Sequence, residues 1–62
     1  MTYTLSATRK DGSVNEIGTK TLFAHARIAA CSAIGADPEI DHVEIMLHGD
    51  VVAYYTREDV NV

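Results

Sequence analysis

The sequence predicts a small α+β domain with the element order ββαββ, a four-stranded antiparallel sheet and one helix packed on one face. Three observations lead to this fold class. Apolar and polar residues alternate over residues 42–57, on both sides of a turn at Gly49-Asp50. A shorter alternation occupies residues 3–17. Between these two hairpins lies an alanine-rich run whose apolar residues recur with helical spacing.

The C-terminal hairpin has the clearest pattern. A two-residue turn at Gly49-Asp50 is favourable because glycine readily adopts the positive φ that such turns require. This turn pairs Ile45 with Tyr54 and puts the large apolar side chains of the hairpin on one face. The residues predicted to face the core are Val43, Ile45, Leu47, Val52, Tyr54 and Thr56.

The N-terminal hairpin is expected to turn through a three-residue loop over residues 10–12, whose glycine adopts a left-handed conformation. That loop pairs Arg9 with Ser13 and brings Leu5 opposite Ile17. The second strand is short and weakly patterned, so we expect it at an edge of the sheet.

A helix is predicted over residues 20–34, with either Thr19 or Thr21 as its N-cap. Gly35 is expected to end the helix in the left-handed conformation, and Pro38 prevents its continuation. One sector of this helix is apolar and is predicted to face the sheet. Its members are Leu22, Phe23, Ala26, Ala29, Ala30, Ala33 and Ile34.

The two hairpins and the helix are expected to form one domain over residues 1–62. If the connection between the hairpins is right-handed and crosses the first strand, the strand order is 2-1-3-4. The sheet face turned away from the helix is then mostly polar. It is predicted to present Thr2, Thr4, Ser6, Thr8, Glu16, His42, Glu44, Met46, His48, Val51, Ala53, Tyr55 and Arg57.

Length and composition limit the class of protein. A chain of 62 residues buries only about 60% of the surface that it exposes when unfolded. Its single cysteine, Cys31, excludes an internal disulfide and suits a reducing compartment. The sequence contains no apolar run of the roughly 18 residues that span a bilayer, and its N-terminus does not resemble a signal peptide. We therefore expect a cytoplasmic protein.

The charges are unevenly distributed along the chain. The net charge is −4, which argues against direct nucleic-acid binding. Residues 1–30 contain four Lys or Arg and two Asp or Glu, whereas residues 31–62 contain one and seven. This asymmetry has two interpretations, solubility or a site for a basic partner.

The acidic residues of the second half are expected at one end of the sheet. The loop over residues 37–41 and the tail over residues 58–59 meet where the third strand begins and the fourth ends. Carboxylates gathered there could bind a basic protein surface, although basic side chains at the same end could neutralise them instead. The predicted partner-binding residues are Asp37, Glu39, Asp41, Met46, Tyr55, Glu58 and Asp59.

No enzyme activity, cofactor or metal is predicted. His42 and His48 lie on one strand with Glu44, but their separation of roughly 20 Å is too large for one ion. His25 and Cys31 are six residues apart on the helix, and helical neighbours are three or four residues apart. The sequence has no nucleophile elbow, Gly-rich phosphate loop or paired catalytic carboxylates.

A homodimer is also expected, because so small a core usually needs additional support. One candidate contact is the outer side of the helix, with Ala24, Ile28 and Cys31. The other is the outer face of the sheet around Tyr55, since tyrosine often anchors interfaces.

Residues 22–62 combine the Ala-rich helix FAHARIAACSAIGA with a closing hairpin and acidic tail, VEIMLHGDVVAYYTREDV, and contain no diagnostic motif. This layout resembles that of some small phage-encoded anti-CRISPR proteins, which inhibit type I CRISPR surveillance complexes. The resemblance implies a non-enzymatic protein that blocks a nucleic-acid-handling complex by binding its surface, and it assigns no role to individual residues. Two other classes remain open: a structural or assembly component of a virus or larger complex, and a small metal-binding protein or enzyme.

Overall fold

The computed structural model describes residues 1–60 and has the predicted element order. Two strands, one helix and two strands follow one another, and a short helix ends the described chain. The elements are β1 (Tyr3–Arg9), β2 (Val14–Lys20), α1 (Phe23–Ala36), β3 (Ile40–Leu47), β4 (Asp50–Thr56) and α2 (Arg57–Val60). Helix α2 is not among the elements predicted from the sequence.

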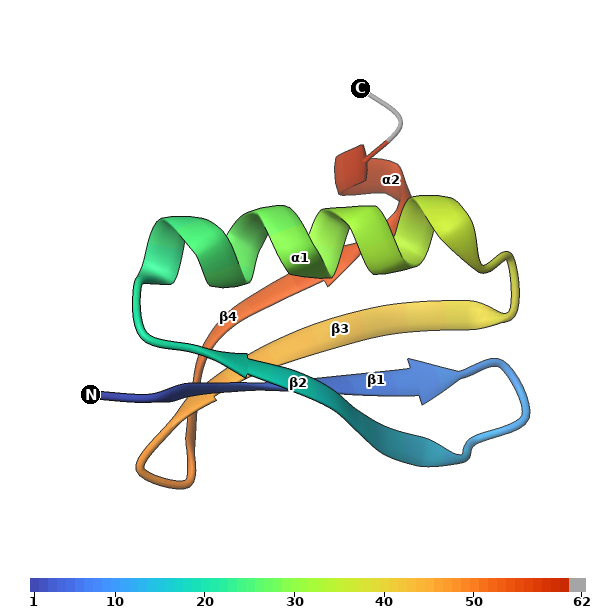
Figure 1. Ribbon diagram of the computed structural model, residues 1–62. Helices are drawn as coiled ribbons and strands as arrows, with labels where there is room; N and C mark the ends of the chain where they lie inside the picture. The colour runs from blue at the N-terminus through green and yellow to red at the C-terminus, as the bar shows by residue number, and fades with distance from the viewer. Residues whose placement is uncertain (61–62) are drawn as a thin grey trace.

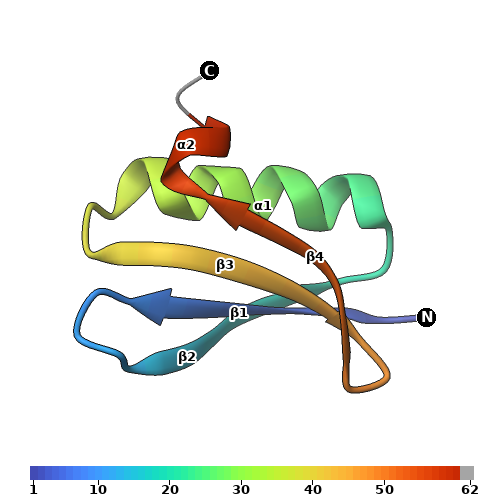
Figure 2. The same cartoon turned by 180° about the vertical axis from the view of Figure 1, so that it is seen from behind.

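The sheet has the order β2-β1-β3-β4, and every neighbouring pair is antiparallel. Helix α1 covers one face of this sheet, and the opposite face has no covering element within residues 1–60 (Figures 1 and 2). The predicted α+β fold and the 2-1-3-4 strand order are therefore confirmed.

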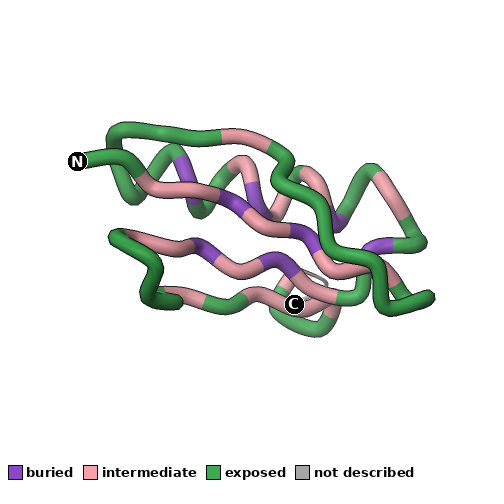
Figure 3. The backbone as a smooth tube through the Cα atoms, turned by 90° about the horizontal axis from the view of Figure 1, so that it is seen from below, coloured by how far each residue is buried: buried purple, intermediate pink, exposed green. Residues whose placement is uncertain are grey.

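The core lies between α1 and the two central strands (Figure 3). Alanine dominates the buried side of the helix, which lets the helix backbone approach the sheet closely. The buried residues are Leu5, Ala7, Ala26, Ala30, Ile34, Ile40, Val43 and Ile45. Only five of these eight side chains are larger than alanine, so the apolar area buried per residue is small.

The loop of the N-terminal hairpin agrees with the prediction. The Arg9 N–H donates to the Ser13 carbonyl at 2.8 Å, and Gly12 has a φ of 93°. The strand pairing farther from the loop differs, because β2 has a β-bulge. Ser6 pairs with Glu16, but the next residue of β1, Leu5, pairs with Gly18. Leu5 therefore lies opposite Gly18 instead of Ile17, which is the extra residue of the bulge.

The C-terminal hairpin turns one residue earlier than predicted. His48 and Gly49 both have positive φ, at 54° and 83°, as a type I′ turn requires of its two central residues. Leu47 therefore pairs with Asp50. This change alone shifts the pairing by two residues, which would leave every side chain on its predicted face.

A β-bulge at Val52 reverses the predicted faces of β4. Beyond the bulge, Ile45 pairs with Ala53 and Val43 pairs with Tyr55. Directly opposed residues share a face, and Val43 and Ile45 are both buried under α1. The prediction that Tyr54 faces the core and Tyr55 faces outward is therefore wrong, because one extra residue moves every following side chain to the other face.

The ends of α1 also differ from the prediction. The helix begins at Phe23, and its N-cap residue Leu22 has no side-chain cap, so neither Thr19 nor Thr21 caps it. Residues up to Lys20 extend β2 instead. Gly35 lies within the helix, and Asp37 in an extended conformation is the C-cap.

The late start leaves two predicted core residues near the surface. Leu22 is 57% exposed and Phe23 is 38% exposed. The Phe23 ring packs edge-on against Tyr3, with ring centroids 5.6 Å apart.

Substitutions of Ile34 and Phe23 distinguish the observed core from the predicted one. We expect Ile34→Ala to lower the free energy of unfolding by about 3 kcal/mol, because it leaves a cavity at a fully buried position. Phe23→Ala should cost about 1 kcal/mol, because more than a third of the residue is already exposed to solvent. Urea denaturation followed by circular dichroism measures both values, and a larger loss for Phe23→Ala would contradict this assignment of the core.

Candidate functional site

The carboxylates predicted to gather at one end of the sheet do so. The Lys10 N–H donates to the Glu39 carbonyl at 2.8 Å, which joins the first hairpin loop to the loop before β3. Asp41 and Glu58 line one shallow hollow with Thr56 and Arg57. We call Asp37, Glu39, Asp41, Glu58 and Asp59 the acidic end.

Arg57 connects three segments at this end of the molecule by hydrogen bonds. Its guanidinium donates to the carbonyls of Ile34 at 3.0 Å, Asp37 at 3.0 Å and Ile40 at 2.8 Å. These three acceptors lie in the last turn of α1, at its C-cap and at the start of β3. The alternation in the sequence places Arg57 on the outer face of the sheet. That placement is wrong, because the chain leaves β4 at Thr56 and the side chain reaches under the end of α1.

The carboxylate of Asp37 already has partners within the molecule. Its carboxylate accepts the Glu39 N–H at 3.0 Å and pairs with Arg9, whose Nη2 lies 2.9 Å from Oδ2. The backbone N–H of Glu39, and then the guanidinium of Arg9, hold the pKa of Asp37 below its ordinary value of 3.8. For this residue, internal neutralisation was the better of the two interpretations.

The carboxylate of Asp59 also accepts hydrogen bonds within the molecule. It accepts the Thr56 N–H at 2.8 Å and the Thr56 hydroxyl at 3.1 Å. With Thr56 directly before α2 and Asp59 three residues later, this is the N-cap N–H interaction of a capping box. The order Thr-Arg-Glu-Asp in the sequence contains this signal, but neither the motif nor the short helix that it starts is among the predictions above.

The outer face of the sheet bears a stacked pair of rings. His42 and Tyr54 have centroids 4.7 Å apart and an interplanar angle of 28°. His42 Nδ1 lies 2.8 Å from Asp41 Oδ2, and its Nε2 lies 3.8 Å from Glu44 Oε1. The His42 side chain is only 18% exposed, whereas Tyr54 is 52% exposed. We call these four residues the Tyr54 surface.

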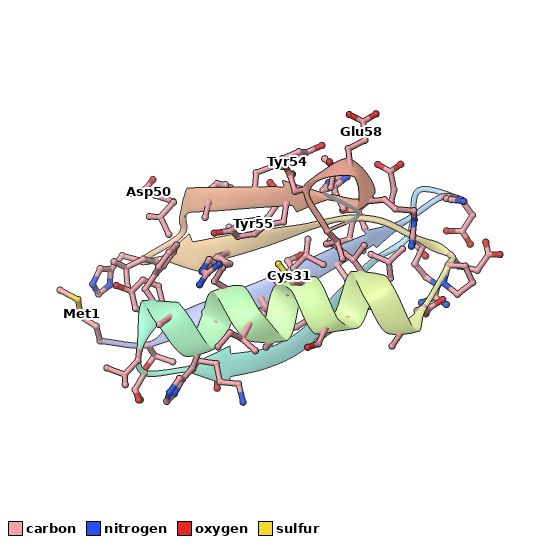
Figure 4. All side chains as sticks on the ribbon, turned by 90° about the horizontal axis from the view of Figure 1, so that it is seen from above. Met1, Cys31, Asp50, Tyr54, Tyr55 and Glu58 are labelled. Carbon is pink, nitrogen blue, oxygen red and sulfur yellow. The ribbon has the colours of Figure 1, made fainter. Side chains whose placement is uncertain are left out.

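Tyr55 and Met46, predicted to act together, lie on opposite faces of the sheet. Tyr55 packs against the core, and Figure 4 shows it with Cys31 between α1 and β4. Met46 pairs with Val51, outside the core. Tyr54 therefore takes the outward position expected for Tyr55, and only the bulge at Val52, which the alternating sequence pattern does not reveal, decides between the two.

The residues of the predicted dimer contact follow one another at i, i+4 and i+7 along α1 and differ in exposure. Ile28 is 58% exposed and Ala24 is also exposed. Cys31 is only partly exposed and lies on the side of α1 that faces Tyr55 (Figure 4). The homodimer stays a prediction, and of these three residues Ile28 and Ala24 are the more exposed.

The described residues also bear on metal sites and membrane spans. Within residues 1–60, no group of three or more His, Cys, Asp or Glu side chains could hold a metal ion. None of the helices in this range is long and apolar enough to cross a membrane. Comparisons with protein-family models, curated proteins and solved structures find no match. We therefore infer a function from the geometry of the acidic end and the Tyr54 surface.

Removing the Arg57 guanidinium should destabilise the fold. We expect Arg57→Met to cost about 2–3 kcal/mol in free energy of unfolding, because three backbone carbonyls lose a charged donor. Arg57→Lys keeps the charge but lacks the planar fork, and it should recover less than half of the loss. Denaturant unfolding of the two variants tests this, and a Lys variant as stable as the parent would contradict it.

Asp37 should contribute to acid sensitivity. A carboxyl whose pKa is lowered by folding stabilises the native state above its unfolded pKa, and this contribution disappears as the pH falls through its folded pKa. Asp37→Asn should therefore be less stable than the parent at pH 7 and equally stable near pH 2. Melting temperatures across this range measure the difference. With Arg9→Met as background the effect of Asp37→Asn should shrink, and a difference that does not vary with pH would contradict the assignment.

Proposed function

We propose that this chain is a non-enzymatic protein-binding module that inhibits a nucleic-acid-handling complex by occupying its basic surface. The observation that supports this most strongly is the Tyr54 surface, where an exposed tyrosine ring is bordered by carboxylates. The resemblance of the sequence layout to that of anti-CRISPR proteins suggests a type I CRISPR surveillance complex as the partner.

The Tyr54 surface has the chemistry of a contact for lysine or arginine. The face of an aromatic ring attracts cations, and Asp41 and Glu44 supply negative charge on the strand beside it. The His42 ring lies behind Tyr54 and is itself bonded to Asp41. Because this support restricts the tyrosine ring before binding, less side-chain entropy is lost on association.

The acidic end supplies attraction at longer range. Glu39 and Glu58 are exposed and take part in none of the ion pairs found among residues 1–60. Figure 4 shows Glu58 projecting outward from the molecule. Unneutralised charge at the rim of an interface accelerates association and makes it dependent on salt.

Binding kinetics on a panel of purified type I surveillance complexes test the proposal. We expect Tyr54→Ala to raise the dissociation rate about 30-fold, which corresponds to a loss of about 2 kcal/mol at an anchoring aromatic residue. The double reversal Glu39→Lys with Glu58→Lys should lower the association rate about tenfold at low salt and weaken its dependence on salt.

A matched control is available outside the acidic end, at Glu16, two strands from Glu44, and at Asp50. Glu16→Lys with Asp50→Lys makes the same change in net charge, but Glu16 lies on the edge strand β2 and Asp50 at the hairpin turn. This control should leave the dissociation rate unchanged and affect association less. Binding to none of the complexes, or an equal effect of the two double reversals, would contradict the proposed function.

A further inference from the structure

The side of α1 that faces β2 borders an apolar groove of about 430 Å³. The helix presents only small side chains to this groove. The residues on its two walls are Ala29, Ser32, Ala33 and Ala36 from α1, and Ile17 and Gly18 from β2. We call this space the α1–β2 groove.

The groove exists because α1 lies over the centre of the sheet while β2 curves away from it (Figure 1). A Cβ built on Gly18 would have no neighbour within 4 Å, so the space above the strand is open. Leu5, which is 1% exposed, lies beneath. The bulge leaves Ile17 42% exposed at the margin. The small helix residues do not fill this space, so it stays accessible, and it is apolar because alanine, leucine and isoleucine side chains line most of it.

One end of the groove is cationic. Lys20 lines it and also lines a second hollow of about 250 Å³ next to it, to which His25 and Ile28 contribute. No residue lining either hollow is acidic. Lys20 belongs to none of the ion pairs formed within residues 1–60.

This cationic mouth lies far from the acidic end. Lys20 pairs with Tyr3 at the start of β1, whereas the strand's other end holds Arg9 bound to Asp37. In a chain of net charge −4, the α1–β2 groove is thus an apolar site with local positive charge. An apolar wall with a few polar groups at one end is the usual composition of a small-molecule site.

We propose that the α1–β2 groove binds a small amphiphile, with an aliphatic chain along the alanine wall and a carboxylate at Lys20. From Ala29 to Ala36 the wall is about 10 Å long at the rise of an α-helix, which suits a medium-length aliphatic chain. Lys20 selects an anionic head group by charge, and the Ser32 hydroxyl is the one polar side chain on the helix wall. This site is separate from the surface assigned to the protein partner.

Titration of the ¹⁵N-labelled protein with sodium decanoate, below its micelle concentration, tests the proposal. We expect saturable shifts in the amide signals of Gly18, Ala29, Ala33 and Ala36. Decanol should bind more weakly at the same residues, and decyltrimethylammonium should not bind there, because Lys20 repels its head group.

Two variants of α1 provide a matched pair. Ser32→Leu fills the groove from an exposed position and should weaken decanoate binding about tenfold. Ala24→Leu adds a similar volume at an exposed position that does not line the groove, and it should bind like the parent. Lys20→Gln should weaken decanoate binding about fivefold at low salt, the upper range for an exposed ion pair, and should leave decanol binding unchanged.

Several results would overturn the proposal. These are the absence of saturable shifts with decanoate, shifts spread over the whole chain, or an equal response to decyltrimethylammonium. Undiminished binding by Ser32→Leu, with a chemical-shift spectrum showing that it is folded, would do the same.

Discussion

The arrangement of the acidic end depends on three hydrogen bonds that the Arg57 guanidinium donates to backbone carbonyls. One guanidinium joins the last turn of α1, the loop after it and the first residue of β3. A planar group with several fixed donors suits this task better than a flexible ammonium. Because the helix C-terminus lacks a left-handed glycine cap, Arg57 satisfies one of the terminal carbonyls that such a cap would otherwise bond. The position of α2, and with it Glu58, follows from this contact.

The bulge at Val52 has the largest consequence for the surface. It turns Tyr55 toward the core and Tyr54 outward onto His42. Both edge strands are in fact bulged, β2 at Ile17 and β4 at Val52. Bulges twist exposed edges and reduce their ability to pair with other chains. In β4 the same irregularity therefore protects an edge and creates an exposed aromatic site.

The alanine-rich core explains why so much apolar surface remains outside. Ala26 and Ala30 allow a close approach of helix and sheet, but they bury little area themselves. Larger side chains such as Ile17, Leu22 and Ile28 stay 42%, 57% and 58% exposed. The exposed apolar residues Ile17 and Ile28 line hollows to which Lys20 also contributes. The exposed Tyr54 lies beside the carboxylates of Asp41 and Glu44. The charge asymmetry of the sequence thus becomes two chemically different surfaces in the folded chain.

The sequence by itself determined the class of fold, the strand order and most of the core. Alternation in residues 42–47, the alanine run and the turn around Gly12 are local signals, because each depends on residues close together in the chain. The clustering of carboxylates also followed, since strand order fixes which loops share an end. Asp59 opposite Thr56 was readable from the Thr-Arg-Glu-Asp order, although its signal was overlooked.

Only the tertiary structure decided the faces of β4 and the role of Arg57. Alternation over residues 51–56 fits either face, because Val52, Tyr54 and Thr56 are as apolar in pattern as Val51, Ala53 and Tyr55. Which residues of β4 face the core depends on packing against α1 and on the bulge, which shifts the strand pairing by one residue. Likewise, the acceptors of Arg57 lie 17 to 23 residues away in the chain, and no local pattern specifies which backbone carbonyls a long side chain will reach once the helix and sheet have packed.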